Sequence, residues 1–258
     1  MIAVILAAGY GTRMHPLTQD TPKALLRIGE RTILGILLDK ISASGAGVRQ
    51  TVVVSNHLFA DAFRKWFADS SASAGSAPPA PGSASSTPAW MVLDDGSTSE
   101  EDRLGSVGDL AFAIRTLRPR EELLVLGSDN LFEDSLEKFV RFARERNAPT
   151  LGAAELPDRA QARLYGVLSV DERQRIVRFA EKPREPESSL VSTAVYFFPP
   201  GTPDLVLEYV SSVKAADTLG SFIAWLIARV PVYASRFRGA WLDIGDVASY
   251  QKAQESFQ

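Results

Sequence analysis

Two glycines, an arginine and a lysine stand close together directly after an apolar run at the start of the chain. The run Ile2–Ala7 is followed by Gly9, Gly11 and Arg13, and Lys23 comes shortly afterwards. Glycine lets the backbone turn tightly and bring its N–H donors against phosphate oxygens, and the two cations supply the charge that a polyphosphate needs. The dinucleotide-binding fingerprint would require a third glycine, which is absent here. The pattern therefore predicts a triphosphate-binding loop.

Two aspartates stand in distant parts of the chain, each beside an apolar stretch. Asp129 follows the run 123–126 and a Gly127-Ser128 bend, and Asp243 follows Trp241. Mg²⁺ prefers one or two carboxylates completed by phosphate oxygens and water. Two aspartates that meet beside a bound phosphate would be sufficient to hold it.

The elements that position these residues are visible in the hydrophobic pattern. The first half predicts strands 2–7, 51–55, 90–93 and 122–127, with helices near 31–44, 58–68 and 106–117 between them. Such alternation predicts an α/β fold with a mostly parallel central sheet. Ligands of parallel sheets collect at the carboxyl ends of the strands. We therefore expect the Gly9–Arg13 loop and Asp129 to meet in space.

The second half has a mixed pattern, which predicts a smaller β/α lobe. Its predicted strands are 149–155, 165–170, 175–180, 191–198 and 231–236, of which the second and third form a hairpin around Asp171-Glu172. Its predicted helices are 203–211 and 219–229, and 247–257 has helical spacing. Residues 69–88 consist mostly of Ser, Ala, Gly and Pro, and we expect them to form a flexible surface loop.

The composition narrows the chemistry. A chain of 258 residues can bury a full core as one domain, and this one has no cysteine and only two histidines. Thiolate catalysis, disulfides and a histidine-rich zinc centre are therefore excluded. The 28 basic and 31 acidic residues are spread along the chain, so we expect neither nucleic acid nor a membrane as partner. Without a basic leader or an apolar run of about 18 residues, we expect a cytoplasmic protein.

These motifs resemble those of the sugar-phosphate nucleotidyltransferases, whose N-terminal signature reads roughly L-A-x-G-x-G-T-R-L-x-P-L-T and then P-K. The matching residues are Leu6–Thr18 and Pro22-Lys23, with Met14 as the departure, and further matches are Gly127–Asn130, Glu181–Pro183 and Trp241–Gly245. The resemblance implies a Rossmann-like three-layer sandwich. It also implies transfer of a nucleotidyl group from a nucleoside triphosphate to a sugar 1-phosphate, with Mg²⁺ as cofactor.

The resemblance implies roles for individual residues. The catalytic residues would be Arg13, Lys23 and Lys182. The nucleotide would be bound by Leu6, Ala8, Gly9, Gly11, Thr12, Gly105 and Asp129. The sugar phosphate would be bound by Tyr165, Gly166, Glu181, Lys182 and Thr193, and the metal by Asp129 and Asp243. Residues 1–258 would form a single domain, with 1–130 mainly the nucleotide-binding half and 131–258 mainly the sugar-binding half.

Two stretches depart from the family's pattern and leave the substrates open. Arg103–Leu110 resembles the base-recognition stretch, but Ser106, Val107 and Asp109 differ from its usual residues. Ser192–Ala194 replaces the frequent Asn-Ala-Gly that precedes a strand. Transfer from dTTP to glucose 1-phosphate is the first choice. The alternative is UTP-, GTP- or CTP-dependent transfer to another sugar or to a non-sugar phosphate.

Two other classes of function compete with this interpretation. A regulatory module would bind nucleotide without turning it over, but Arg13, Asp129 and Asp243 are all present, and a degenerate module would be expected to lose one of them. A nicotinamide-dependent reductase would need glycine where Met14 stands. The sequence leaves a homo-oligomer open.

Overall fold

The computed structural model describes residues 1–73, 89–213 and 217–257. Its strands are β1 (Ile2–Leu6), β2 (Arg27–Ile28), β3 (Arg31–Thr32), β4 (Gln50–Ser55), β5 (Ala89–Asp94), β6 (Leu123–Gly127), β7 (Asn130–Phe132), β8 (Thr150–Glu155), β9 (Gly166–Val170), β10 (Ile176–Glu181), β11 (Leu190–Phe198), β12 (Tyr233–Arg236) and β13 (Trp241–Asp243). Its α-helices are α1 (Ile33–Ala43), α2 (Ala60–Ser73), α3 (Gly105–Leu117), α4 (Leu136–Arg146), α5 (Thr202–Ser212), α6 (Leu219–Leu226) and α7 (Val247–Ser256).

Nine of the described strands form one sheet, in the order β10-β9-β11-β6-β1-β4-β5, with β8 beside β11 and β12 beside β8. β1 pairs in parallel with β4 and β6, and β4 pairs in parallel with β5, so the predicted parallel centre is confirmed. β11 runs antiparallel to β6, and through it the second half extends the same sheet. The predicted hairpin is also confirmed, as β9 and β10.

β1 shows why helices cover both faces of the sheet. Ile2 and Val4 pack into the core that α3, α5 and α6 cover, whereas Ala3 and Ile5 pack into the core that α1, α2 and α4 cover. All four side chains are at most 1% exposed. A strand buried on both faces needs a continuous apolar run rather than an alternating one, and β1 has such a run. The expected three-layer arrangement is therefore confirmed.

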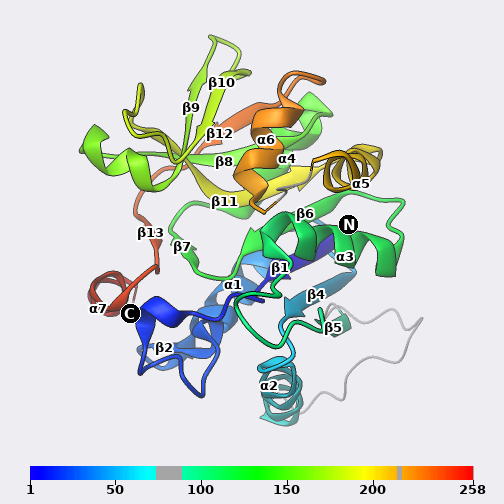
Figure 1. Cartoon of the computed structure of the whole chain (residues 1–258), viewed down its shortest axis with the longest axis vertical. Helices are drawn as coiled ribbons and strands as arrows, with labels where there is room; N and C mark the ends of the chain where they lie inside the picture. Colours follow the sequence, from blue (N-terminus) through cyan, green and yellow to red (C-terminus); the bar gives the residue numbers. More distant parts are fainter. Residues whose placement is uncertain (74–88, 214–216, 258) are drawn as a thin grey trace.

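Two short strands and the last helix connect the end of the chain to its beginning. β13 pairs antiparallel with β7, which places Asp243 opposite Asn130. Beyond β13, α7 starts with a capping box at Asp246. Figure 1 shows α7, in red, beside the blue segment that contains β2, where the Tyr250 hydroxyl donates to the Arg27 carbonyl at 2.6 Å.

Helix α4 was not predicted, although its sequence carries the signal. Leu136, Phe139, Val140 and Ala143 are buried and follow the i, i+3, i+4, i+7 spacing of one helix face. Ser135 caps the helix by accepting a hydrogen bond from the Glu137 backbone. The many charged residues on its other face lower its overall hydropathy, so a search for apolar runs passes over it.

Helix α2 extends into the segment predicted to be a flexible loop. It runs to Ser73, so the prediction is wrong for residues 69–73, and 74–88 lie outside the described residues. Phe63 and Phe67 anchor α2 in the core, and a helix that tertiary packing has stabilised can continue through small residues. With 14 residues, α2 is the longest described helix, and within the described residues no helix has the length and apolar character to cross a bilayer.

Candidate active site

The loop after β1 is a tight turn that presents an arginine. Gly11 has a φ of 66°, in the left-handed region that glycine adopts without steric cost. Its carbonyl accepts a hydrogen bond from Thr18 Oγ1 at 2.7 Å. The following 3-10 turn, Thr12–Met14, buries Met14 and leaves Arg13 exposed where it lines the pocket. The turn therefore anchors the loop through its apolar residue and keeps its guanidinium available.

Lys23 joins two distant segments of the chain. Its Nζ donates to Asp129 Oδ2 at 2.6 Å and to the Ile244 carbonyl at 3.0 Å, and Asp129 Oδ1 accepts from Asn130 Nδ2 at 2.8 Å. Burial alone would raise the pKa of Asp129, but the charge and hydrogen bond of Lys23 outweigh it, and the pKa lies below its ordinary value. Asp129 is therefore ionised at neutral pH.

Asp243 lies close to Asp129 because β13 pairs with β7, and the Ile244 backbone donates to the Asp129 carbonyl at 2.8 Å. Burial, and after it the negative charge of Asp129, raises the pKa of Asp243 to about 7, and Lys23 and Arg13 offset this in part. One end of the pocket thus holds two crowded carboxyl groups, of which the second loses its proton readily when a cation binds.

This donor set fits a divalent cation such as Mg²⁺. Among the described residues none forms a hydrogen bond with the Asp243 carboxylate that a cation would have to displace, and Asp129 keeps lone pairs beyond those that Lys23 and Asn130 use. No group of three or more His, Cys, Asp or Glu side chains gathers as a metal cage in the part of the chain that the structure describes. Phosphate oxygens and water would have to complete the shell, as Mg²⁺ commonly requires.

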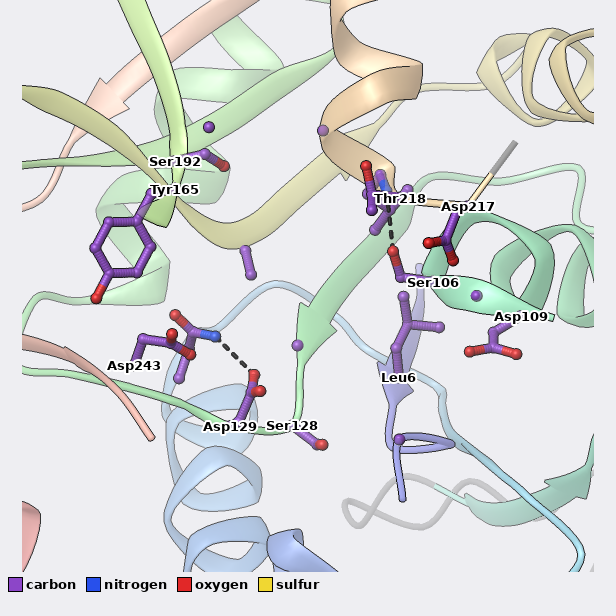
Figure 2. Close-up of a pocket in the computed structure, with 18 of the residues that line it drawn as sticks. Leu6, Ser106, Asp109, Ser128, Asp129, Tyr165, Ser192, Asp217, Thr218 and Asp243 are labelled. Carbon is purple, nitrogen blue, oxygen red and sulfur yellow. Dashed lines mark hydrogen bonds between the residues drawn. The ribbon is translucent and has the colours of Figure 1, made fainter. Parts of the chain in front are cut away.

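These groups line one cavity of about 360 Å³ at the carboxyl edge of the parallel strands. The predicted site residues that line it are Leu6, Ala8, Gly9, Gly11, Arg13, Lys23, Gly105, Asp129, Tyr165, Gly166, Glu181, Lys182 and Asp243. They come from both halves of the chain. Figure 2 shows several of them facing one another across the cavity.

An aromatic pair forms one wall. The Tyr165 ring meets Trp241 edge to face, with 5.1 Å between ring centroids, and Trp241 Nε1 donates to Asn130 Oδ1 at 2.9 Å. In Figure 2, Tyr165 and Asp243 lie on the same side of the pocket. A rigid aromatic surface beside a charged site suits a ligand with both apolar ring faces and polar groups, as a sugar has.

Glu181 and Lys182 stand at the end of β10. Burial raises the pKa of Glu181, and the charge of Lys182 counters this in part. Lys182 has a φ of 45°, which is uncommon outside glycine, and its backbone donates to the Tyr165 carbonyl at 3.0 Å. A Cβ on Gly220 would overlap Glu181 Oε2. The N-terminus of α6 therefore closes directly over the glutamate.

Two predicted residues lie outside the pocket lining. Thr12 is exposed in its turn. Thr193 is fully buried, its Oγ1 has no hydrogen-bond partner, and it faces Gly152, where an added Cβ would lie 2.5 Å from that oxygen. The neighbours Ser192 and Ala194 line the pocket instead, because side chains alternate along β11. The position of Thr193 therefore does not support a direct sugar-phosphate contact.

The pocket has a further wall, formed by α3 and by a segment that the sequence analysis did not assign. The segment Asp217–Gly220 docks on α3, where the Leu219 backbone donates to Ser106 Oγ at 2.9 Å and the Arg103 guanidinium lies 3.2 Å from Asp217 Oδ2. Asp109 lines the same wall. The one sequence signal for this wall is Thr218, a capping residue before the predicted helix 219–229.

Comparison with known proteins identifies the family of the chain. The profile of the family described as nucleotidyl transferase matches residues 2–258. The chain belongs to that family. It is similar to the UTP--glucose-1-phosphate uridylyltransferase of Synechocystis sp., with 30% identity over 98% of this chain and 62% of that protein. It is also 26% identical to the bifunctional protein GlmU of Methanocaldococcus jannaschii, over 95% of this chain and 51% of that protein.

A third relative is the putative mannose-1-phosphate guanyltransferase of Sulfolobus acidocaldarius, 25% identical over 97% of this chain and 61% of that protein. The chain thus spans between about half and three fifths of the length of these relatives.

Solved structures agree on the fold. A UDP-glucose pyrophosphorylase complexed with UDP-glucose has a TM-score of 0.79, with 18% identity over 99% of this chain and 97% of that one. A putative glucose-1-phosphate thymidylyltransferase from Bacillus anthracis has a TM-score of 0.74, with 20% identity over 99% and 94% of the two chains. These likenesses confirm the α/β fold with its mostly parallel central sheet.

Proposed function

We propose that this protein transfers a nucleotidyl group from a nucleoside triphosphate to a sugar 1-phosphate and releases pyrophosphate. The observation that carries the proposal is the convergence of Arg13, Lys23, Asp129 and Asp243 in one cavity that Tyr165, Glu181 and Lys182 also line. Cations and metal-binding carboxylates suit a polyphosphate, and a carboxylate beside a lysine and an aromatic ring suits a phosphorylated sugar.

The proposed reaction is an in-line displacement at the α-phosphorus. An oxygen of the sugar 1-phosphate forms the new P–O bond, the bond between the α-phosphorus and its bridging oxygen to the β-phosphorus breaks, and pyrophosphate leaves with that electron pair. A phosphate monoester has a second pKa of about 6, so the attacking oxygen is already ionised at neutral pH and needs no general base. The protein has mainly to position the reactants and neutralise their charge.

Each charged residue then has one task. Arg13 would bind the departing pyrophosphate, Lys23 the α-phosphate and Lys182 the phosphate of the acceptor, while Glu181 would orient sugar hydroxyls. Asp129 and Asp243 would hold Mg²⁺, which supplies charge neutralisation at the reacting phosphate when bound. Residues 1–130 would mainly bind the nucleotide and 131–258 mainly the sugar.

The similar proteins include uridylyl, guanylyl and thymidylyl transferases, so similarity alone does not identify the base of the nucleotide. The resemblance of the motifs makes dTTP and glucose 1-phosphate the first pair to test. The direct experiment measures pyrophosphate release with Mg²⁺ across dTTP, UTP, CTP, GTP and ATP, each with a panel of sugar 1-phosphates.

The expected result is release with at least one pair, abolished in Asp243→Asn and on chelation of the metal. Arg31→Ala, a change of an exposed arginine outside the cavity, is the matched control and should retain release. Nucleotide binding without release across the whole panel would overturn the proposal and favour a non-catalytic regulatory module.

A further inference from the structure

A buried side chain holds the backbone at the point where the chain leaves β1 and enters the glycine turn. Ala8 and Gly9 line the cavity there. Pairing of β1 with β4 continues just past the strand, where the Ala7 backbone donates to the Val54 carbonyl at 2.8 Å. One residue further on, a side chain takes over, because Asn56 Nδ2 donates to the Ala8 carbonyl at 3.0 Å. Asn56 therefore connects the sheet to the turn.

The Asn56 amide is fixed in one orientation. Asn56 directly follows β4 and is 0% exposed. Besides the bond from Nδ2 to the Ala8 carbonyl, its Oδ1 accepts from the Phe59 backbone at 3.0 Å, just before α2. The reverse orientation would set oxygen against oxygen and N–H against N–H. A buried amide costs free energy unless its polar atoms are paired, and both ends of this amide are paired.

The direction of the Ala8 carbonyl sets the direction of the next N–H. In a planar trans peptide, the C=O of one residue and the N–H of the next point in opposite directions. Because the Ala8 carbonyl points to buried Asn56, the Gly9 N–H points to the exposed side of the turn. Apart from the neighbours of Gly9 in the chain, no described residue has an atom within 4 Å of the position that a Cβ would take there. A ligand oxygen has room to approach this N–H.

The other N–H groups of the turn are unused as well. Within the described residues, no hydrogen bond engages the backbone N–H of Ala8, Gly9, Tyr10 or Gly11. The Gly11 carbonyl, in contrast, is held by the hydroxyl of Thr18, which is 1% exposed. Buried side chains thus hold a carbonyl near each end of the turn, and successive N–H groups are left over between them. Such a run of N–H groups forms an anion-binding concavity.

We propose that Asn56 is a positioning residue of the nucleotide site, which holds the Ala8–Gly9 peptide so that the Gly9 N–H donates to a phosphate oxygen of the triphosphate. This inference rests on the proposed function, which sets the triphosphate against the turn. Asn56 acts through the peptide and not by touching the ligand. Without its N–H donor, the buried Ala8 carbonyl would be unpaired. Rotation of the peptide would relieve this, and it would turn the carbonyl oxygen in place of the N–H towards the phosphates.

Two substitutions separate this role from the contact with the segment before α2. Asn56→Asp keeps the volume and the acceptor for the Phe59 backbone, but it has no N–H donor when ionised. Asn56→Ser also keeps an acceptor for that backbone and adds no charge, and its hydroxyl is too short to reach the Ala8 carbonyl. Ser135→Ala is the matched control, because it removes a side-chain cap from α4 at a position that does not line this cavity.

The test measures binding of inorganic triphosphate with Mg²⁺ by calorimetry at pH 8. This probe has no base and no sugar, so it reports on the phosphate site alone. Loss of one hydrogen bond to a charged group should weaken its binding by about tenfold or more in both Asn56 variants. KM for the nucleotide should rise in parallel, whereas KM for the sugar 1-phosphate should keep its parent value. Ser135→Ala should bind the probe as the parent does.

Nuclear magnetic resonance of ¹⁵N-labelled protein gives a direct readout of the peptide. The Gly9 amide resonance of the parent should shift when inorganic triphosphate is added, and this shift should be lost in both Asn56 variants. Thermal unfolding shows which variants are folded, and if Asn56→Asp does not fold, Asn56→Ser decides. A Gly9 resonance that responds equally in parent and variants overturns the inference.

The outcomes separate this inference from the proposed function. Parent-like binding of inorganic triphosphate by either folded Asn56 variant overturns the inference and leaves the transferase standing if the parent turns over. Equal weakening in Ser135→Ala assigns the effect to general destabilisation and also overturns it. Binding that depends on Asn56, without pyrophosphate release from any substrate pair, supports the inference and overturns the proposed reaction. A parent that does not bind inorganic triphosphate overturns both.

Discussion

Lys23, Asp129 and Asp243 act in opposite ways on folding. Lys23 and Asp129 form an ion pair, whereas Asp243 forms no ion pair within the described residues and is repelled by Asp129. In the proposed cation site this repulsion persists until a cation binds and removes it. Variants of Asp129 and Asp243 should therefore differ in their free energy of unfolding even where both lose activity.

Removal of the Asp129 carboxylate and removal of the Asp243 carboxylate should affect stability differently. Asp129→Asn leaves the ammonium of Lys23 without its counter-charge and should lower the free energy of unfolding by about 1–3 kcal/mol. Asp243→Asn removes a repelled carboxyl and should leave that free energy within about 0.5 kcal/mol of the parent, or raise it. Urea unfolding at neutral pH without metal measures both. A larger loss of stability in Asp243→Asn than in Asp129→Asn would contradict this account of the pair.

Arg13 should matter for rate far more than for folding, because its side chain is exposed and forms no ion pair with any residue that the structure describes. Arg13→Ala should lower kcat by about 10²–10³-fold, the usual effect of removing a group that stabilises developing charge. The kcat of Arg13→Lys should lie between those of the parent and Arg13→Ala, because lysine keeps the charge but lacks the planar guanidinium. Steady-state pyrophosphate release measures this, with thermal unfolding to show that the fold is intact. An effect on KM alone would contradict the role in the transition state.

At the scale of elements, the site depends on how closely helices approach strands. α3 and α6 both begin at the pocket, and a glycine near the start of each helix allows a close contact. Gly105 of α3 contacts Asp217, and Gly220 of α6 contacts Glu181. A Cβ at either glycine would overlap the neighbouring carboxylate, so glycine is needed for Asp217 and Glu181 to keep their positions. Helix packing thereby sets the positions of Asp217 and Glu181 in the wall of the cavity.

Gly220→Ala should displace the Glu181 carboxylate while leaving the protein folded, because the side chain is flexible and alanine favours a helix. We expect KM for the acceptor to rise by about tenfold, with KM for the nucleotide unchanged. Ala224→Gly weakens the same helix without filling the pocket and is the matched control. If both variants raise the acceptor KM equally, the effect comes from helix stability and not from the glutamate.

At the scale of the whole molecule, the buried carboxyl groups of Asp95 and Asp109 tie the pH dependence of folding to the wall of the cavity, which Asp109 lines. Asp95, Arg103 and Asp217 face Asp109, and the net effect is a folded-state pKa of about 8 against 3.8 for an ordinary aspartate. The folded state therefore holds a proton that the unfolded chain has already released over this range. The contribution of Asp109 to stability is fully present below the unfolded-state pKa and is lost as pH rises through the folded-state pKa.

The free energy of unfolding should accordingly fall between about pH 4 and pH 8, with a contribution from Asp109 approaching about 1.4 kcal/mol per pH unit. Asp109→Asn removes the titrating group. The free energy of unfolding of the parent should therefore fall steadily relative to that of the variant as pH rises across this range. Denaturant unfolding at several pH values measures it. Parallel curves for the two proteins would show that Asp109 does not titrate in this range.

The sequence by itself determined the parallel centre of the sheet, the glycine turn after β1 and most of the residues between Leu6 and Lys23 that line the cavity. These features are local, because a buried strand, a glycine turn and a nearby cation are set by neighbours in the chain. The ordered motifs around Asp129, Glu181 and Asp243 identified the remaining candidates before any contact was known.

Only the tertiary structure decided how distant residues face one another. It turned Thr193 into the core, because the pairing of β11 chooses which alternate side chains meet the pocket, and it brought Asp217–Gly220 over Glu181. It also set Asp109 against Asp95, where burial changes its charge state. The physical reason is that desolvation, like-charge repulsion and steric exclusion depend on distances across the fold, which spacing along the chain does not contain.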